Sequence, residues 1–258
     1  MTNDYKLTIA WLYPDLMSTY GDRGNIICLQ KRCQWRGIDV KIKPITLETQ
    51  NSQLSGCNLI FMGGAQDRQQ KLAANDFLNN KAPVVKQMIE NYIPALFVCA
   101  AYQQIGHFYR PFQGQDIIGA SIFDLSTIHP GDQAKRLIGN VAARLIYPDV
   151  LSGTVIVGFE NHGGRTSLGN KLKPLAKIIG GFGNNGQDGF EGAFYKNAIG
   201  SYFHGPLLPK NPQIADWLIK SALEVKYAKN ITLAFLDDSL AQLARQKILD
   251  RLKIIYER

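Results

Sequence analysis

The segment at residues 95–103, ALFVCAAYQ, decides the fold of this chain. Its four leading apolar residues are typical of a strand buried on both faces, and the residues after Cys99 have a helical pattern. A cysteine at a sharp turn from strand to helix projects its sulfur out of the sheet and needs small neighbours such as Ala100 and Ala101. The segment therefore predicts a buried strand that ends in a candidate nucleophile.

Strand and helix patterns alternate on the N-terminal side of this segment. Strands are predicted at Lys6–Tyr13, Asp39–Ile42 and Asn58–Met62, with a helical period over 26–33 and helices at 67–79 and 83–92. Such alternation is typical of an α/β fold with a doubly wound, mostly parallel sheet, the architecture of flavodoxin-like cores. Ligands of such sheets bind beyond the carboxyl ends of the strands, where GGAQD and CAAYQ both lie.

The C-terminal half has a different texture. From about residue 117 to residue 202 it is rich in glycine, with short strands predicted at 137–138, 154–157 and 193–195, which indicates a β-rich elaboration. A helix is predicted at 211–228. The last segment, 238–256, places apolar residues on one helical face: Leu240, Leu243, Ala244, Ile248, Leu252 and Ile255. We therefore predict one domain at 1–228 and a C-terminal helical extension at 229–258, packed on the domain or on a partner.

Composition limits the possible functions. The 258 residues include 29 Lys and Arg against 21 Asp and Glu, a net charge of +8, but the basic residues are scattered and form no nucleic-acid-binding motif. No apolar run approaches the roughly 20 residues of a transmembrane helix, and the N-terminus lacks the layout of a secretory signal. The four cysteines form no C-x-x-C pair. We expect a soluble cytoplasmic protein with reduced thiols, no transmembrane segment, no bound nucleic acid and no metal site.

Two histidines compete as the base that would serve Cys99. His204 follows a predicted strand at 199–203 and precedes Gly–Pro, whereas His162 lies among polar residues and glycines in GFENHGG. Gly63 and Gly64 follow the apolar strand predicted at 58–62, and this pair fits either a tight turn or an oxyanion hole. A buried cysteine can also be a small apolar core residue, and a histidine can be purely structural. Spacing alone leaves these alternatives open.

The motifs together resemble a known family. MGGAQD, VCAAYQ and FHGP resemble class I glutamine amidotransferases, and GFENHGG resembles their cobyric-acid-synthase (CobB/CobQ) branch. The stretches YPDLMSTYGDRGN, KRLIGN at 135–140 and HGPLLPKNP at 204–212 are similar to GatD-type glutaminase subunits of lipid II isoglutaminyl synthase. The resemblance runs from about residue 6 to residue 225.

The resemblance implies a role for each of six residues. By the family pattern Cys99 is the nucleophile and His204 the general base, while the N–H groups of Gly64 and Ala100 form the oxyanion hole. Two residues are implied to bind the substrate, Gln103 and Arg136, whose guanidinium can grip the carboxylate of L-glutamine with two hydrogen bonds.

The resemblance also implies a heterodimeric partner. A Mur-ligase-like subunit of the MurT type would use ATP and Mg²⁺ to activate the D-glutamate α-carboxylate of lipid II. This chain, which contains no nucleotide-binding motif and is expected to need no cofactor, would supply the ammonia that forms D-isoglutamine for peptidoglycan. Two alternatives remain: a PfpI-like cysteine hydrolase, and a degenerate, non-catalytic amidotransferase that acts as a binding subunit.

Two positions depart from the family pattern. Ala100–Ala101 replaces a Gly–Gly pair that is common after the nucleophile, so we expect some strain at the turn. Pro206 occupies the position where many class I enzymes have the glutamate of a catalytic triad, which leaves Glu160 as our candidate for the residue that orients His204.

Overall fold

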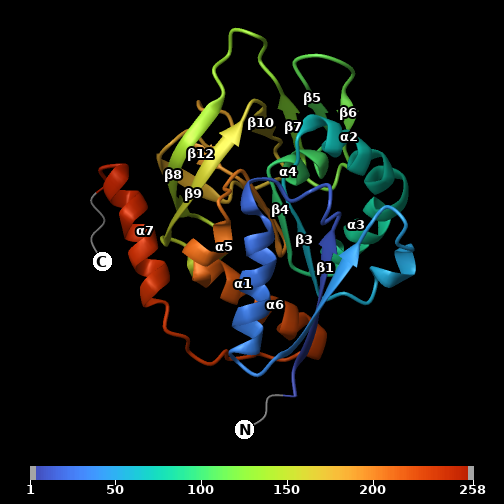
Figure 1. Ribbon diagram of the computed structural model, residues 1–258, viewed down its shortest axis with the longest axis vertical. Helices are drawn as coiled ribbons and strands as arrows, with labels where there is room; N and C mark the ends of the chain where they lie inside the picture. Colours follow the sequence, from blue (N-terminus) through green and yellow to red (C-terminus); the bar gives the residue numbers. More distant parts are fainter. Residues whose placement is uncertain (1–3, 255–258) are drawn as a thin grey trace.

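A central six-stranded sheet organises the chain in the computed structural model, which describes residues 4–254 (Figure 1). Its order is β13-β14-β4-β3-β1-β2. The strands are β1 (Lys6–Leu12), β2 (Asp39–Ile45), β3 (Leu59–Met62), β4 (Ala95–Val98), β13 (Ala193–Tyr195) and β14 (Ala198–Ser201). Neighbours from β14 to β2 are parallel, and β13 is an antiparallel edge. The predicted doubly wound, mostly parallel α/β fold is confirmed.

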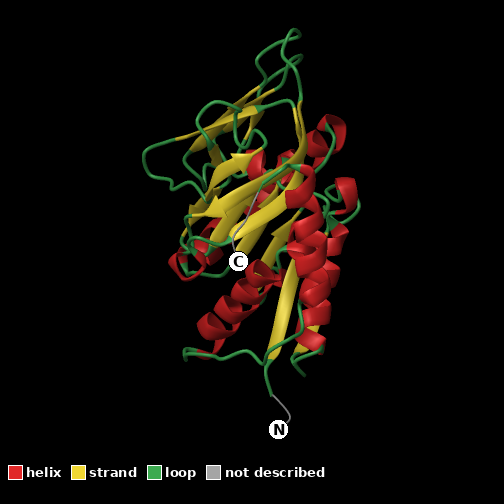
Figure 2. Ribbon diagram, turned by 90° about the vertical axis from the view of Figure 1, so that its left-hand side faces the viewer, coloured by secondary structure: helices red, strands yellow, loops and turns green. Residues whose placement is uncertain are grey.

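Helices cover both faces of this sheet (Figure 2). The chain leaves β1 toward one edge and leaves β3 toward the other, so right-handed crossovers place the helices between these strands on opposite faces. The helix α1 (Arg23–Gln34) packs against α6 (Pro212–Tyr227). Along the chain, α2 (Asp67–Asp76) and α3 (Ala82–Glu90) follow β3 and precede β4. Because every residue of β3 and β4 is buried, their unbroken apolar runs match the sequence-based prediction.

Two predicted elements have different bounds in the structure. The strand predicted at 39–42 continues through Pro44 to Ile45, because β2 is an edge strand, where the missing N–H of proline leaves no neighbour unpaired. The helix predicted at 67–79 ends at Asp76 and continues as a π-helical turn at Phe77–Lys81.

Two further four-stranded sheets form the predicted β-rich elaboration, in the orders β10-β7-β5-β6 and β12-β11-β8-β9. Their strands are β5 (Phe108–Arg110), β6 (Ile117–Ile118), β7 (Leu125–Ile128), β8 (Leu137–Leu145), β9 (Val155–His162), β10 (Arg165–Leu168), β11 (Ala176–Gly180) and β12 (Phe190–Glu191). The short strands predicted at 137–138 and 154–157 are wrong in length, since β8 and β9 form a long antiparallel hairpin. Gly139, Ala142 and Ala143 interrupt the apolar pattern of β8 and conceal its length in the sequence.

The C-terminal helix α7 (Ser239–Arg251) packs on the β8–β9 hairpin of the same chain. Its buried contact is Leu249, at 1% exposure, against Ala142 and Val155. Of the predicted apolar face, Ile248 and Leu252 pack against the same cluster, whereas Leu240 and Leu243 are 81% and 58% exposed in this chain. Contact of the exposed leucines with a partner stays a prediction, and the predicted residue Ile255 lies outside the described range.

The carboxyl edge of the central sheet collects the candidate functional residues. Gly64 follows β3, Cys99 follows β4 and His204 follows β14, as the parallel topology requires. Within residues 4–254, no helix is both long and apolar enough to cross a lipid bilayer.

Candidate active site

Cys99 forms a sharp elbow between β4 and the short helix α4 (Ala100–Gln104). Its backbone has φ 54° and ψ −106°, a conformation that residues with a side chain rarely adopt, and its N–H donates to the carbonyl of Ser201 at 2.8 Å. Such local strain persists only where the surrounding structure enforces it. The expectation of strain at Ala100–Ala101 is wrong, because both alanines are helical and the unusual conformation falls on Cys99 itself.

His204 lies beside this elbow, fully buried. Its backbone is held against β9, where its N–H donates to the carbonyl of Phe159 at 2.8 Å and its carbonyl accepts from the Phe159 N–H at 3.2 Å. A Cβ atom placed on Gly64 would lie 2.8 Å from Cε1 of His204 and 3.3 Å from Cβ of Cys99. The structure therefore brings Cys99, His204 and Gly64 to one point, where any larger residue in place of Gly64 would collide with the imidazole.

Sequence reasoning missed Asp22, which is completely buried at the same point. Since an ionised carboxylate only accepts hydrogen bonds, Nδ1–H of His204 donates to Oδ1 of Asp22, at 3.0 Å. The N–H of Gly64 donates to Oδ2 at 2.7 Å. The prediction that Glu160 orients His204 is wrong, because its carboxylate accepts from the N–H groups of Phe182 and Gly183 instead. The available signal was that an acidic residue follows β1 at the same sheet edge.

The charges around His204 keep its imidazole protonated. Burial lowers its pKa, but attraction to the Cys99 thiolate and the hydrogen bond to Asp22 outweigh this effect and raise the pKa to about 10. Nε2 of His204 is buried and makes no hydrogen bond of good geometry within the described chain, so the sulfur acts on the ring mainly through its charge. The arrangement can hold an imidazolium next to a thiolate, the reactive form of cysteine.

The two predicted oxyanion donors, the N–H groups of Ala100 and Gly64, differ in whether they already have a hydrogen-bond acceptor. Ala100 is the first residue of α4, so its N–H has no acceptor within the helix. The N–H of Gly64, by contrast, is occupied by Asp22 in this structure and does not point at an empty site. Gly64 can therefore serve a substrate oxygen only after that hydrogen bond is broken.

Gln103 has no free polar group. Its Nε2 donates to the hydroxyl of Tyr202 at 3.1 Å, and its Oε1 accepts from Nε2 of Gln70, also at 3.1 Å. The same Gln70 nitrogen donates to the carbonyl of Ala100 at 3.3 Å. In this structure Gln103 supports the elbow from behind, in contrast to the direct substrate contact that the resemblance implies.

Arg136 lies at the rim, exposed, immediately before β8. Its guanidinium donates to the side chain and, at 3.0 Å, to the carbonyl of Asn161. Burial raises the pKa of Tyr109 to about 12, and that pKa also responds to the charges of Arg136 and Cys99. A Cβ atom placed on Gly163, between β9 and β10, would lie 3.6 Å from Nη1 of Arg136, so the guanidinium lies beside this turn.

His162, the competing base, is stacked on Tyr202 with ring centroids 3.6 Å apart. Its Nδ1–H donates to the carbonyl of Gly164 at 2.8 Å, which fixes the tautomer. Burial, together with the nearby charge of Arg165, lowers its pKa to about 3. This imidazole stays neutral in the pH range where His204 holds a proton, so the two histidines differ in charge.

In an assay of the glutaminase activity that the sequence resemblance implies, His162→Gln should leave the pH profile of ammonia release unshifted. The expected reason is that neutral His162 does not titrate between pH 5 and pH 10, and the glutamine amide can still donate to the Gly164 carbonyl. In the comparison variant His204→Asn, the rate should fall by at least about a hundredfold. A displaced alkaline limb in His162→Gln would show that His162 is the titrating base.

The remaining cysteines have a different environment. Burial raises the pKa of Cys28 and of Cys33 to about 12 and also raises that of Cys57, so these thiols are poor nucleophiles at neutral pH. Within the described residues, no group of three or more His, Cys, Asp and Glu side chains could hold a metal ion.

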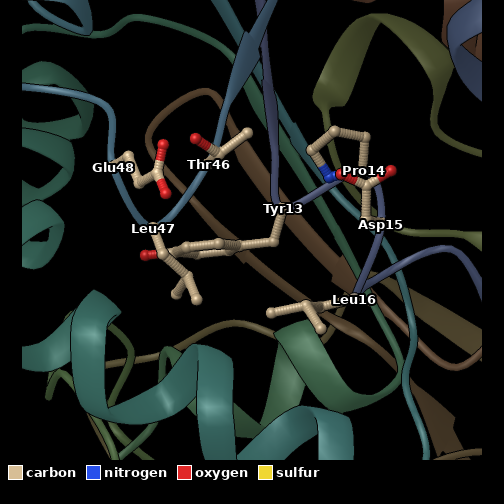
Figure 3. Close-up of a pocket in the computed structure, with 7 residues that line it drawn as sticks. All are labelled: Tyr13, Pro14, Asp15, Leu16, Thr46, Leu47 and Glu48. Carbon is tan, nitrogen blue, oxygen red and sulfur yellow. The ribbon is translucent and has the colours of Figure 1, made fainter.

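A separate pocket of about 350 Å³ lies between the ends of β1 and β2 (Figure 3). It is lined by the start of the β1–α1 loop, Tyr13–Leu16, and by Thr46, Leu47 and Glu48. Neither Cys99 nor His204 lines it, so it is distinct from the candidate active site.

Comparison with known proteins agrees with this geometry. Residues 8–212 match the CobB/CobQ-like glutamine amidotransferase domain. The chain is 40% identical over 222 residues to the lipid II isoglutaminyl synthase (glutamine-hydrolyzing) subunit GatD of Staphylococcus aureus, which covers 86% of each chain. It is 36% identical over 242 residues to the subunit of the same name from Streptococcus pneumoniae, which covers 92% of this chain and 88% of the relative.

Solved structures share the fold at low sequence identity. The chain aligns with a chain of PurLQS from Thermotoga maritima at a TM-score of 0.59 and 16% identity, over 88% of this chain and 100% of the other.

Proposed function

This chain belongs to the CobB/CobQ-like glutamine amidotransferase family, and from that premise we propose that it is the glutaminase subunit of a lipid II isoglutaminyl synthase. The meeting of Cys99, His204 and Gly64 at one sheet edge carries the proposal. In this role the chain hydrolyses L-glutamine and passes ammonia to a second active site. The family match favours this function over a PfpI-like hydrolase.

The reaction follows from the charges in the site. The thiolate of Cys99 attacks the side-chain amide carbon of glutamine, and the resulting oxyanion accepts hydrogen bonds from the N–H groups of Ala100 and Gly64. His204 gives its Nε2 proton to the amide nitrogen, the C–N bond breaks, and ammonia leaves a thioester. Water then gives a proton to His204 while its oxygen attacks the thioester, which releases glutamate and restores Cys99.

The partner in this proposal is a Mur-ligase-like subunit of the MurT type. It would bind ATP and Mg²⁺ and activate the D-glutamate α-carboxylate of lipid II, which the ammonia converts to D-isoglutamine in the cytoplasm. Support comes from the names of the two relatives, each a subunit of a glutamine-hydrolysing synthase. Support also comes from the lack of a nucleotide-binding motif in this sequence. Protonated ammonia is not nucleophilic, so its transfer requires a path shielded from bulk water.

Labelling with a glutamine-analogue electrophile tests the proposal. We expect modification of Cys99 alone among the four cysteines, together with ammonia release from glutamine by the chain in complex with its partner. If the chain neither releases ammonia nor reacts, it is a binding subunit instead of a glutaminase. If the isolated chain amidates lipid II with ATP, the proposed division of labour is wrong.

Arg136→Met should raise KM for glutamine by about 10- to 100-fold and change kcat much less. The expected reason is the loss of charge-assisted hydrogen bonds to the substrate carboxylate, which act equally in the ground and transition states. Arg110→Met, which removes another exposed arginine, on β5, is the matched control and should leave KM unchanged. An unchanged KM in Arg136→Met would assign carboxylate binding to another residue.

A further inference from the structure

We propose that Asp22 is a positioning residue with two tasks, one for each carboxylate oxygen. Oδ1 orients the imidazole of His204, and Oδ2 occupies the oxyanion donor of Gly64 in the substrate-free chain and must release it during each turnover. This inference rests on the proposed glutaminase function and goes beyond it, because it makes the resting site incomplete.

The position of Asp22 in the chain supports a role in the site over a role in the helix. It directly precedes α1, where an aspartate usually accepts a hydrogen bond from the first helical N–H groups. Here the side chain makes no such capping bond. The carboxylate instead turns toward the sheet edge, where both of its oxygens are used by His204 and Gly64. The helix gives up a stabilising interaction that the site gains.

The β1–α1 loop forms hydrogen bonds with both backbone polar groups of Gly64. Its carbonyl accepts from the N–H of Thr19 at 3.0 Å, and its own N–H donates to Asp22 at 2.7 Å. A backbone amide offers a single hydrogen, so a charged acceptor at 2.7 Å excludes a second strong acceptor. A substrate oxygen can use Gly64 only if Oδ2 moves away.

The chemistry itself supplies the force for that release. When the tetrahedral intermediate forms on Cys99, its oxyanion and the Asp22 carboxylate are two negative groups that compete for one N–H. The oxyanion is fixed by its covalent bond, so the carboxylate is the group that turns. The loop contains three residues with left-handed backbone, Tyr13 at φ 50°, Tyr20 at φ 57° and Gly21 at φ 81°. Tyr20 is half-exposed, with its ring edge against His204.

Four titratable groups lie around His204 on the elements packed against it. Cys99 faces it from the β4–α4 elbow, and Asp22 and Tyr20 face it from the β1–α1 loop. His162 on β9 lies within electrostatic range. Of these, only Cys99 and Asp22 raise the pKa of His204, so the loss of either should make its proton easier to remove.

Asp22→Asn in the complex with the partner tests the first task. Ammonia release requires protonated His204, so the rate falls on the alkaline side as that proton is lost. Because asparagine carries no charge, we expect this alkaline limb to move to lower pH by about one unit and kcat to fall at least about tenfold. The control Asp15→Asn changes an exposed residue of the same loop and should leave both quantities unchanged. An alkaline limb that stays in place in Asp22→Asn overturns the positioning role.

A structure of the wild-type chain with a glutamine-derived aldehyde, which adds to Cys99 as a tetrahedral thiohemiacetal like the intermediate, tests the second task. The expected result is a hydrogen bond from Gly64 N–H to the thiohemiacetal oxygen of the adduct, with Oδ2 of Asp22 beyond hydrogen-bond distance. A Gly64 N–H that still donates to Asp22 in the adduct overturns it. Wild-type complex that releases no ammonia contradicts the proposed function itself, whereas an active wild type with either contrary result contradicts only the role of Asp22.

Discussion

Cys99→Ser should reduce ammonia release from glutamine by at least about a thousandfold. The hydroxyl of serine does not ionise beside the His204 imidazolium, so the variant loses both the nucleophile and the charge pair that the structure holds. The strained elbow and its small neighbours should be retained, because serine differs from cysteine by one atom. The measurement is ammonia release by the complex at saturating glutamine.

Cys28→Ser is the matched control for this variant. Cys28 is partly exposed on α1 and is not part of the elbow between β4 and α4. Its replacement should therefore leave turnover within about twofold of the wild type. Equal thermal unfolding midpoints for the two variants would show that the loss is chemical. Turnover that survives in Cys99→Ser removes the thiol from the mechanism.

Asp216→Ala should lower the free energy of unfolding by about 3 kcal/mol. Asp216 accepts from Nε of Arg32 at 2.6 Å and from Nη2 of Arg36 at 2.7 Å, and the side chains of these arginines are only 5% and 2% exposed. Asp238 also accepts from Arg32, at 2.6 Å, and ties the segment before α7 to α1. Loss of Asp216 leaves Arg36 without an ionic partner in a buried place, which costs more than the pair contributed.

Asp116→Ala provides the comparison for this prediction. Asp116 forms a similar ion pair with Arg110 at 2.8 Å, but on an exposed surface, where solvent screens the charges and the pair contributes little. Urea denaturation of both variants gives the difference in their free energies of unfolding, provided that the dependence of that free energy on urea concentration is the same in both. Equal stability of the two variants would show that burial of the arginines does not determine the contribution of the cluster.

The parts of the fold that the sequence predicted are those with local patterns. The short unbroken apolar runs of β3 and β4, bounded by turn residues, are typical of strands covered on both faces, and the residues after parallel strands lie at one sheet edge. The predicted length of the β8–β9 strands was wrong, and only part of the predicted apolar face of α7 is buried in this chain. Small residues weaken the pattern of β8, and the side of α7 that is buried depends on the hairpin that it meets.

The candidate site divides in the same way. Cys99, Gly64 and His204 each follow a strand of the central sheet, so motif and topology together were enough to bring them to one edge. Asp22 was missed because its role depends on how the β1–α1 loop turns back over the end of β3, which no spacing encodes. The engagement of Gln103 with Gln70 and Tyr202 depends likewise on side chains that are distant along the chain.

By itself, then, the amino-acid order determined the sheet and the elbow at Cys99, because strand burial and turn geometry depend on neighbouring residues. Only the tertiary structure decided which acid holds His204 and that the Gly64 amide is occupied at rest. These are contacts between loops far apart in the chain, and their formation depends on distances of a few tenths of an ångström after the whole sheet has assembled.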